Sequence, residues 1–171
     1  MDCLFPVAVL AGGLATRLRP LTETIPKALV DVAGQPFIAR QLEYLHAQGV
    51  RHVVLCVGHL GEMIQEVVGT GARYGLQVHY SFDGPKLLGT GGALKQALPL
   101  LGEHFFVLYG DSYLPVDFST VQNAYVRSGQ PALMTVLKNG DRWDKSNVLF
   151  VDSQLVEYNK RAPRAEMTYI D

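Results

Sequence analysis

The chain has 171 residues, of which 48% are hydrophobic and 18% charged, and its formal net charge at pH 7 is -1. This length predicts one folded domain, and this composition excludes a disordered chain and argues against a broad basic surface for nucleic acid. We therefore expect no nucleic-acid partner. No apolar run approaches the roughly 20 residues that a membrane span needs, so we expect no membrane partner.

Strands and helices are predicted to alternate along most of the chain. Apolar runs with strand character occupy residues 6–11, 52–57, 77–81 and 105–109. Helical spacing or helix-start signals occupy residues 36–48, 62–68, 92–98 and 119–127. Because strand and helix follow each other repeatedly, we expect an α/β fold with a largely parallel sheet and right-handed crossovers.

The pattern changes after Pro131. Three further strands are predicted with no helix between them, at residues 133–137, 148–151 and 155–158. Asp152-Ser153 is typical of a hairpin turn, so we expect an antiparallel extension of the sheet within the same domain. Residues 167–171 resemble a strand that has only begun, which favours a chain that lacks part of its parent fold.

The two cysteines, Cys3 and Cys56, lie in or beside apolar segments that are predicted to be strands. Buried, reduced thiols are the favoured interpretation and a disulfide is the minor one. The N-terminal segment lacks the basic region of a signal sequence and runs into a glycine turn. We therefore expect a cytoplasmic protein.

The strongest local signal for chemistry follows the first predicted strand. Gly12 and Gly13 predict a tight turn with successive exposed N–H groups, which suits phosphate oxygens. Arg17 adds a planar guanidinium that can hold two phosphate oxygens, and Lys27 adds a compact positive charge. A plain turn with solvated cations is the alternative, and for the glycines alone it is the better one. Glycines and two cations together after a buried strand favour a phosphate-binding loop.

Three later segments carry further signals. Gly89 and Thr90 open a predicted helix, where N–H groups could face an anion and a flat base could approach; a plain N-cap at Thr90 fits equally well. Asp111 follows the strand at residues 105–109, where a carboxylate could hold Mg²⁺ beside a phosphate loop. A turn-initiating aspartate is the alternative, and the shared sheet edge favours the metal. Lys160 could reach a second anion, although a solvated lysine is the better interpretation of that residue alone.

Other common chemistries find little support. The five histidines lack the spacing of a zinc-binding helix, and no Gly-Lys pair is present for a Walker A loop. No G-x-S-x-G motif is present to anchor a hydrolase triad. Surface or structural roles are the simpler explanation for the histidines.

The segment from Leu10 to Phe37 resembles the sugar-nucleotide pyrophosphorylases, also called sugar-1-phosphate nucleotidyltransferases. Their pattern is G-G-x-x-T-R-L-x-P-L-T, then P-K-x-L, then G-x-P, and all of it occurs here in that order. Residues 89–94 and 109–111 match two later landmarks. Lys160 matches a fourth, where the family commonly has Glu-Lys and this chain has Asn-Lys. Among the subgroups, the chain looks nearest to the compact bacterial enzymes for mannose, heptose or N-acetylmuramate 1-phosphates.

The resemblance implies a Rossmann-like three-layer α/β nucleotidyltransferase fold, mostly parallel with an antiparallel C-terminal extension. It implies a single domain over residues 1–171 that lacks its C-terminal part. In the implied reaction, a nucleoside triphosphate and a sugar 1-phosphate give a nucleotide sugar and pyrophosphate, with Mg²⁺ as cofactor. The resemblance does not decide the oligomeric state, and a homo-oligomer is one of the alternatives.

The resemblance also implies roles for the residues that match the family pattern. The implied catalytic residues are Arg17 for the departing pyrophosphate, Lys27 for the transition state and Asp111 for the metal. The implied base and ribose contacts are Leu10, Ala11, Gly12, Gly13, Gly89 and Thr90. The implied sugar-phosphate contacts are Asn147, Glu157 and Lys160. The family usually adds a second metal-binding carboxylate farther along, and nothing in this chain clearly replaces it.

Two other functions stay open. A nucleotide-binding or sugar-phosphate-binding module of the same fold would bind its ligand without releasing pyrophosphate. A related transferase would act on a non-sugar phosphate, and the sugar half of the site would decide between these substrates. A purely structural role would leave the two glycine-rich loops, Arg17, Lys27 and Asp111 without a joint explanation.

Overall fold

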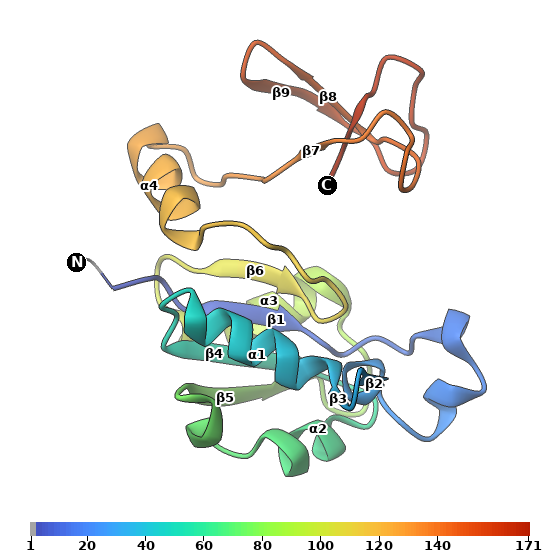
Figure 1. Cartoon of the computed structure of the whole chain (residues 1–171), viewed down its shortest axis with the longest axis vertical. Coiled ribbons are helices and arrows are strands. Elements are labelled where there is room, and N and C mark those ends of the chain that lie inside the picture. The colour runs from blue at the N-terminus through green and yellow to red at the C-terminus, as the bar shows by residue number, and fades with distance from the viewer. Residues whose placement is uncertain (1–2) are drawn as a thin grey trace. The chain divides into compact units, whose positions relative to one another are not determined.

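A computed structural model describes residues 3–171, and the chain divides into two compact units (Figure 1). The first unit covers residues 1–122 and the second covers residues 123–171. The boundary falls within helix α4 (Phe118–Ser128). The parallel sheet lies in the first unit, and the C-terminal antiparallel sheet lies in the second.

The first unit is built on a parallel sheet with the strand order β5-β4-β1-β6. Its strands are β1 (Val7–Leu10), β4 (His52–Val57), β5 (Gln77–Phe82) and β6 (Phe106–Tyr109). The chain builds outward from β1 through β4 to β5, then returns and adds β6 on the other side of β1. Such a reversal creates a crevice at the carboxyl ends of the strands that flank it. The predicted parallel sheet is confirmed, and its crevice falls between β1 and β6.

Helices cover both faces of this sheet, as predicted for a three-layer fold; in Figure 1, α1 lies in front of the strands and α3 behind them. The helices are α1 (Phe37–Ala47), α2 (Gly61–Val68) and α3 (Gly89–Leu101). Val7 and Val9 of β1 point into the larger core, which α1 and α2 complete. Ala8 points to the opposite face and packs in the core that α3 closes. This alternation follows the two-residue period of a strand.

The sequence pattern does not predict several short elements that connect the strands. They are the 3-10 helices η1 (Thr16–Leu18), η2 (Leu21–Glu23), η3 (Lys27–Leu29) and η4 (Ala72–Tyr74), and the strands β2 (Asp31–Val32) and β3 (Gln35–Pro36). Elements of this length are too short to show a hydrophobic period. Most of them lie between β1 and α1, so this connection is folded rather than an open loop.

The second unit contains an antiparallel sheet with the strand order β7-β10-β8-β9. Its strands are β7 (Leu137–Lys138), β8 (Val148–Val151), β9 (Gln154–Tyr158) and β10 (Tyr169–Ile170). The turn between β8 and β9 places Asp152 and Ser153 in the left-handed region, with φ of 49° and 62°. Two such residues match the right-handed twist of the strands that they join. The predicted hairpin is confirmed.

The predicted antiparallel C-terminal part is confirmed. Within the described residues, its strands form a sheet separate from the parallel sheet. The strand expected at residues 133–137 is reduced to β7, because β10 pairs only with Leu137 and Lys138. Residues 131–136 have no partner strand for ladder hydrogen bonds, and they stay irregular.

The two cysteines differ in burial. Cys56 is buried on β4, as expected, whereas Cys3 is exposed, and both are free thiols. Cys3 precedes β1 and so lies outside the sheet that buries Cys56. Separately, no helix within residues 3–171 combines the length and the apolar character that a bilayer crossing requires.

Candidate active site

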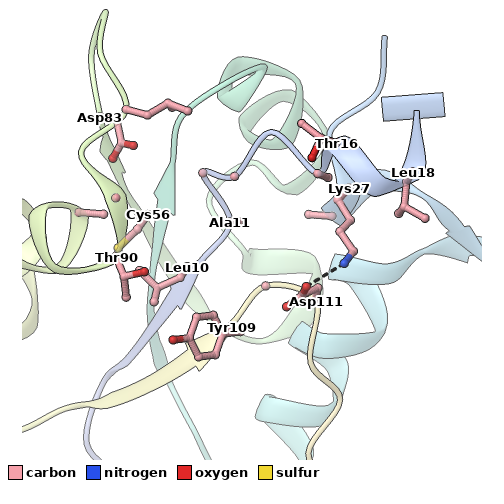
Figure 2. A pocket seen from close by; sticks show the side chains of 18 of the residues that line it. Leu10, Ala11, Thr16, Leu18, Lys27, Cys56, Asp83, Thr90, Tyr109 and Asp111 are labelled. Atoms are coloured by element: carbon pink, nitrogen blue, oxygen red, sulfur yellow. Dashed lines mark hydrogen bonds and ion pairs between the residues drawn. The ribbon is translucent and has the colours of Figure 1, made fainter. Parts of the chain in front are cut away.

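The first unit contains a cleft of about 510 Å³ at the carboxyl ends of its parallel strands (Figure 2). Leu10 at the end of β1, Cys56 near the end of β4 and Tyr109 at the end of β6 all line it. The other walls come from the loop after β1, the start of α3 and the segment that follows β6. The cleft therefore occupies the crevice that the reversal of strand order creates.

Every residue predicted to contact the nucleotide or to take part in catalysis lines this one cleft. The predicted nucleotide contacts in its wall are Leu10, Ala11, Gly12, Gly13, Gly89 and Thr90, and the predicted catalytic residues are Arg17, Lys27 and Asp111. Figure 2 shows Lys27 and Asp111 on one side of the cleft, and Thr90 and Asp83 on the other. The predicted contacts come from three separate stretches of sequence, residues 10–27, 89–90 and 111, so the fold is what brings them together.

Backbone hydrogen bonds fix the ends of the central strands against each other. The N–H of Gly110 donates to the carbonyl of Leu10 at 2.9 Å, and the N–H of Ala11 donates to the carbonyl of Cys56 at 2.8 Å. A Cβ on Gly110 would lie 2.8 Å from the Leu10 carbonyl oxygen, so the backbones approach too closely for any other residue. The segment that carries Asp111 therefore leaves the sheet from a fixed point.

In the glycine loop after β1, the predicted tight turn is not formed at the glycines themselves. Gly12 and Gly13 both lie outside the left-handed region, and the left-handed residue of this loop is Ala15, with a φ of 46°. A Cβ on Gly12 would lie 3.1 Å from the backbone nitrogen of Gly58, whereas a Cβ on Gly13 would meet no atom within 4 Å. At Gly12 two backbone segments pass close together and a side chain would be tight, whereas Gly13 leaves open space beside the cleft.

Lys27 and Asp111 form an ion pair in the cleft (Figure 2). The ammonium nitrogen of Lys27 lies 2.7 Å from Oδ2 of Asp111, and their side chains are 42% and 46% exposed. Lys27 begins η3, and the next residue, Ala28, is buried in the larger core and anchors this segment. Within residues 3–171, Arg17 forms no ion pair, so its guanidinium is available to an anion in the same cleft.

The start of α3 borders the cleft through Gly89 and Thr90. Leu88 is the N-cap residue, and no side chain caps the helix. Thr90 lies inside the first turn, so the structure does not adopt the alternative in which Thr90 is a plain N-cap. The first N–H groups and the positive end of the helix dipole are therefore available to polar atoms of a ligand.

Sequence reasoning missed Asp83 and Cys56, which also line the cleft. Asp83 follows β5 directly, and its Oδ2 accepts a hydrogen bond at 3.1 Å from the N–H of Leu88, just before α3. A carboxylate at the carboxyl end of a parallel strand was the available signal, as at Asp111. Burial and then the charge of Asp83 raise the pKa of the Cys56 thiol to about 11. The thiol stays protonated at neutral pH and is no nucleophile.

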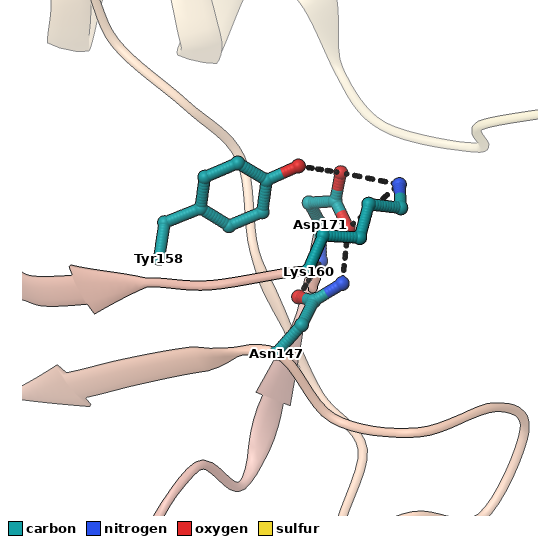
Figure 3. Close-up of polar contacts among 4 residues, drawn as sticks. All are labelled: Asn147, Tyr158, Lys160 and Asp171. Atoms are coloured by element: carbon teal, nitrogen blue, oxygen red, sulfur yellow. Dashed lines mark hydrogen bonds and ion pairs between the residues drawn. The ribbon is translucent and has the colours of Figure 1, made fainter. Parts of the chain in front are cut away.

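The second unit contains a smaller cleft of about 270 Å³. Asn147 and Lys160, both predicted to contact the sugar phosphate, line it together with Asp171. The Asp171 carboxylate accepts hydrogen bonds from Nδ2 of Asn147 at 2.6 Å, the Tyr158 hydroxyl at 3.0 Å and the Lys160 ammonium at 3.1 Å (Figure 3). Burial acts to raise the pKa of Asp171, but these hydrogen bonds outweigh it and the pKa is lowered.

Glu157, the third residue predicted on the sugar side, does not line this second cleft. It lies on β9, and its carboxylate pairs with the guanidinium of Arg164. The next residue, Tyr158, reaches Asp171, and adjacent side chains of a strand point to opposite faces of the sheet. Strand geometry therefore turns Glu157 away from Asn147 and Lys160.

The surroundings of Asp111 have the chemistry for a magnesium ion that arrives with phosphate. A carboxylate oxygen is a ligand that Mg²⁺ prefers, and Mg²⁺ usually keeps water and substrate phosphates as its other ligands. In the described part of the chain, no three His, Cys, Asp or Glu side chains gather to hold a metal. Asp111 therefore suits an ion whose other ligands come from a substrate, and not a metal held by protein side chains alone.

Comparison with known proteins identifies a family. A family model described as "Nucleotidyl transferase" matches residues 7–146. An N-acetylmuramate alpha-1-phosphate uridylyltransferase from Neisseria meningitidis is 42% identical over 112 residues, which cover 65% of this chain and 48% of the relative. A D-glycero-alpha-D-manno-heptose 1-phosphate guanylyltransferase from Campylobacter jejuni is 32% identical over 146 residues, which cover 85% of this chain and 63% of the relative. The chain thus spans less than two thirds of either relative.

A solved structure shares the fold. HddC from Yersinia pseudotuberculosis, crystallised in complex with GMP-PN, superposes with a TM-score of 0.71 at 28% sequence identity. The superposition covers 98% of this chain and 73% of that chain. The match therefore includes both the parallel sheet of the first unit and the antiparallel sheet of the second.

Proposed function

The chain belongs to the nucleotidyl transferase family, and from this premise we propose that it transfers a nucleoside monophosphate from a nucleoside triphosphate to a sugar 1-phosphate. The two units would then act as one nucleotidyltransferase domain. The observation that carries the proposal is the single cleft at the strand reversal, which gathers the glycine loop, two cations and a carboxylate. No feature of the second unit duplicates this combination within the described residues.

The charges in the cleft support one orientation of the nucleotide. The triphosphate belongs beside Arg17 and Lys27, where a guanidinium fork and an ammonium neutralise its oxygens. The base and ribose belong between the end of β1 and the start of α3, where Gly89 and Thr90 leave room for a flat ring. This orientation uses every nucleotide contact that the sequence pattern predicts.

The proposed reaction is an in-line displacement at the α-phosphorus. An oxygen of the sugar phosphate forms a bond to that phosphorus, and the bond from the phosphorus to the oxygen that bridges to the β-phosphate breaks. Pyrophosphate leaves with the electron pair of that bond, so no protein nucleophile is needed. Catalysis then consists of positioning and charge neutralisation. Arg17 binds the departing pyrophosphate, and Lys27 stabilises the negative charge that builds up around the α-phosphorus.

Asp111 would hold the Mg²⁺ ion, which supplies charge neutralisation on the triphosphate when it is bound. Asp111 is suited to this role because its carboxylate is 46% exposed and lies beside the phosphate-binding side chain of Lys27. The role of Asp111 is therefore to fix where the charge of the bound ion sits relative to the two cationic side chains.

The second cleft supports a site for the sugar 1-phosphate. Lys160 and Asn147 supply an ammonium and an amide that suit phosphate and hydroxyl oxygens. Asp171 already holds both side chains by hydrogen bonds, so the donors are oriented before a ligand arrives. Glu157 is a weaker candidate for a sugar contact, because its carboxylate is engaged by Arg164.

The named relatives narrow the substrates to be tested. One relative is a uridylyltransferase, another is a guanylyltransferase, and HddC was crystallised with GMP-PN. We therefore propose UTP or GTP as the nucleotide. The same names point to N-acetylmuramate and heptose 1-phosphates as acceptors, and the sequence resemblance adds mannose 1-phosphate.

The test is release of pyrophosphate with Mg²⁺, measured for each nucleoside triphosphate against each sugar 1-phosphate and against phosphocholine. Release with one sugar 1-phosphate, abolished in Lys27→Met and Asp111→Asn and kept in the surface variant Lys95→Met, supports the proposal. Release with phosphocholine alone identifies a transferase for a non-sugar phosphate. Thermal stabilisation by a nucleotide without any release identifies a binding module and contradicts the proposed reaction.

A further inference from the structure

We propose that Gln41 is a positioning residue that holds Asp111 in place opposite Lys27. The effect of this placement on nucleotide binding rests on the proposed function. The hydrogen bonds by which Gln41 holds the Asp111 segment do not depend on that function. Gln41 lies in the middle of α1 and is 1% exposed. The sequence pattern alone assigns it no role.

One side-chain amide holds both ends of the segment that carries Asp111. Nε2 of Gln41 donates to the carbonyl of Tyr109 at 3.0 Å and to the carbonyl of Ser112 at 2.8 Å. Tyr109 is the last residue of β6, and Ser112 follows Asp111 directly. Both protons of the amide are therefore used to fix the backbone on either side of Gly110 and Asp111.

The other atom of the same amide shows what Gln41 contributes. Oε1 of Gln41 is buried and accepts no hydrogen bond within the described residues. An unpaired buried oxygen is destabilising, and a leucine or methionine would fill the space without it. The contribution specific to glutamine is its pair of N–H donors. A buried polar group that keeps such a defect is expected where function requires a particular geometry.

The same helix also holds the segment that carries Lys27. The N–H of Phe37, the first residue of α1, donates to the carbonyl of Val30 at 2.9 Å, just after η3. One turn along, Nε of Arg40 donates to the carbonyl of Val32 at 2.6 Å. Helix α1 is therefore a shared support, with the Lys27 segment attached at its start and the Asp111 segment attached at Gln41.

A rigid shared support fixes the spacing of the two charged groups. Lys27 and Asp111 come from different connections of the sheet, and each side chain is close to half exposed, so the ion pair alone holds them weakly. If the N–H donors of Gln41 are removed, the backbone on either side of Asp111 loses its hydrogen bonds to α1, while the Lys27 segment keeps its own. The backbone should then become less fixed at Asp111 and not at the glycine loop.

Hydrogen exchange measures the clamp directly. The N–H of Ser112 donates to the carbonyl of Tyr109, so its exchange reports whether the clamped segment opens. In Gln41→Met, which keeps the volume and removes the donors, this amide should exchange at least tenfold faster than in the wild type. Tyr44→Phe is the matched control, because it removes one hydrogen bond from the same helix to Val116, beyond the clamp. Unchanged exchange at Ser112 in Gln41→Met overturns the proposal.

Nucleotide binding measures the consequence for Asp111. The quantity is the ratio of the nucleotide Kd in EDTA to the Kd in Mg²⁺, determined by calorimetry for wild type, Gln41→Met, Asp111→Asn and Tyr44→Phe. Gln41→Met should lower this ratio at least threefold, toward the ratio of Asp111→Asn, through a higher Kd in Mg²⁺ and with a Kd in EDTA that does not rise. A Gln41→Met ratio equal to that of the wild type, when Asp111→Asn lowers it, overturns the positioning role.

Two further outcomes remain decisive. If Mg²⁺ fails to tighten nucleotide binding in the wild type, the proposed function fails, and exchange at Ser112 alone still decides whether Gln41 holds the segment. If Gln41→Met does not fold, the wild-type protein provides the test by NMR. Both side-chain amide protons of Gln41 should then exchange slowly with water, and rapid exchange of either proton overturns the proposal.

Discussion

Nζ of Lys27 lies 2.7 Å from Oδ2 of Asp111, inside the cleft that gathers the predicted nucleotide contacts. The two groups are thus partners of each other as well as candidate ligands for phosphate and for a cation. A phosphate that binds Lys27 and a cation that binds Asp111 both compete with this ion pair. A ligand that brings phosphate and cation together replaces the lost partner on both sides at once.

Removal of Lys27 should therefore strengthen the binding of a free divalent cation. In Lys27→Met, the Kd for Mn²⁺ without nucleotide should fall about two- to fivefold, because a partly exposed ion pair contributes up to about 1 kcal/mol. The Kd for a nucleoside triphosphate should rise in the same variant. Manganese binding is measured by electron paramagnetic resonance. Lys95→Met removes an exposed lysine of α3 and controls for net charge, and an equal gain in that control would contradict the competition.

Removal of Asp111 should strengthen the binding of a metal-free phosphate. Asp111→Asn should lower the Kd for tripolyphosphate in EDTA about two- to fivefold, because Lys27 loses its competing carboxylate. Calorimetry at low ionic strength measures this Kd, because salt weakens both the ion pair and the binding of phosphate to Lys27. Asp83→Asn removes a carboxylate from the other side of the same cleft, where no lysine or arginine pairs with it among the described residues. A similar or larger gain in Asp83→Asn would mean that general electrostatics, and not the ion pair, sets the effect.

The point where the chain leaves β6 beside the end of β1 should tolerate no side chain at Gly110. A Cβ there would lie 2.8 Å from the carbonyl oxygen of Leu10 and 3.0 Å from Cβ of Ala11. Gly110→Ala should lower the free energy of unfolding by about 1–3 kcal/mol, because backbone atoms must move apart. Gly13→Ala should change it by less than about 0.5 kcal/mol, because that Cβ meets no atom within 4 Å. Urea denaturation compares the two variants, and equal stability of the two would show that the strands separate easily.

The sequence predicts the first unit well because its strands are continuous apolar runs. The run from His52 to Val57 is buried from its second residue onward, and it becomes β4 with the predicted bounds. Residues 133–137 are also apolar except for Thr135, but only Leu137 among them joins a strand. Composition marks a segment that is able to form a strand, and a partner strand decides whether it does.

The sequence predicts the site residues that follow a predicted strand or lie in the family pattern, and misses the others. Arg17, Lys27 and Asp111 carry signals in the sequence because they follow predicted strands or lie in the family pattern. Gln41 carries none, because its two acceptors lie 68 and 71 residues away and a polar residue on a helix is ordinarily assigned to the surface. Glu157 rests on the family resemblance alone, and the two-residue period of β9 turns it away from Asn147 and Lys160.

The two cysteines should differ strongly in reactivity. Cys56 is 1% exposed and its thiol has a pKa of about 11, whereas Cys3 is exposed. At pH 8, iodoacetamide should alkylate Cys56 at least about a hundredfold more slowly than Cys3, because burial and a small thiolate fraction act together. Peptide mass spectrometry after timed quenching measures both rates. In urea both cysteines should react at similar rates, and comparable rates in the native protein would mean that the end of β4 opens readily.

Asp171 should make the stability of the second unit depend on pH. Its pKa is lowered in the folded state because hydrogen bonds from Asn147, Lys160 and Tyr158 outweigh its burial. Between the lowered pKa and the unfolded value of about 3.9, the unfolded chain binds more protons, so stability rises with pH in that window. The contribution is complete above this window and is lost as the pH falls through the folded pKa.

Asp171→Asn isolates this contribution. Hydrogen exchange of β8 and β9 should show the variant less stable than the wild type by about 1–3 kcal/mol at pH 6, because hydrogen bonds to a charged carboxylate are lost. The difference should shrink steadily as the pH falls below about 4. Asp152→Asn is the control. It changes a carboxylate in the turn of the same sheet that accepts no hydrogen bond in the described residues. Asparagine also tolerates the left-handed conformation of that turn. If the stability difference between Asp171→Asn and the wild type persists unchanged to pH 2, the effect of Asp171 comes from its shape and not from its charge.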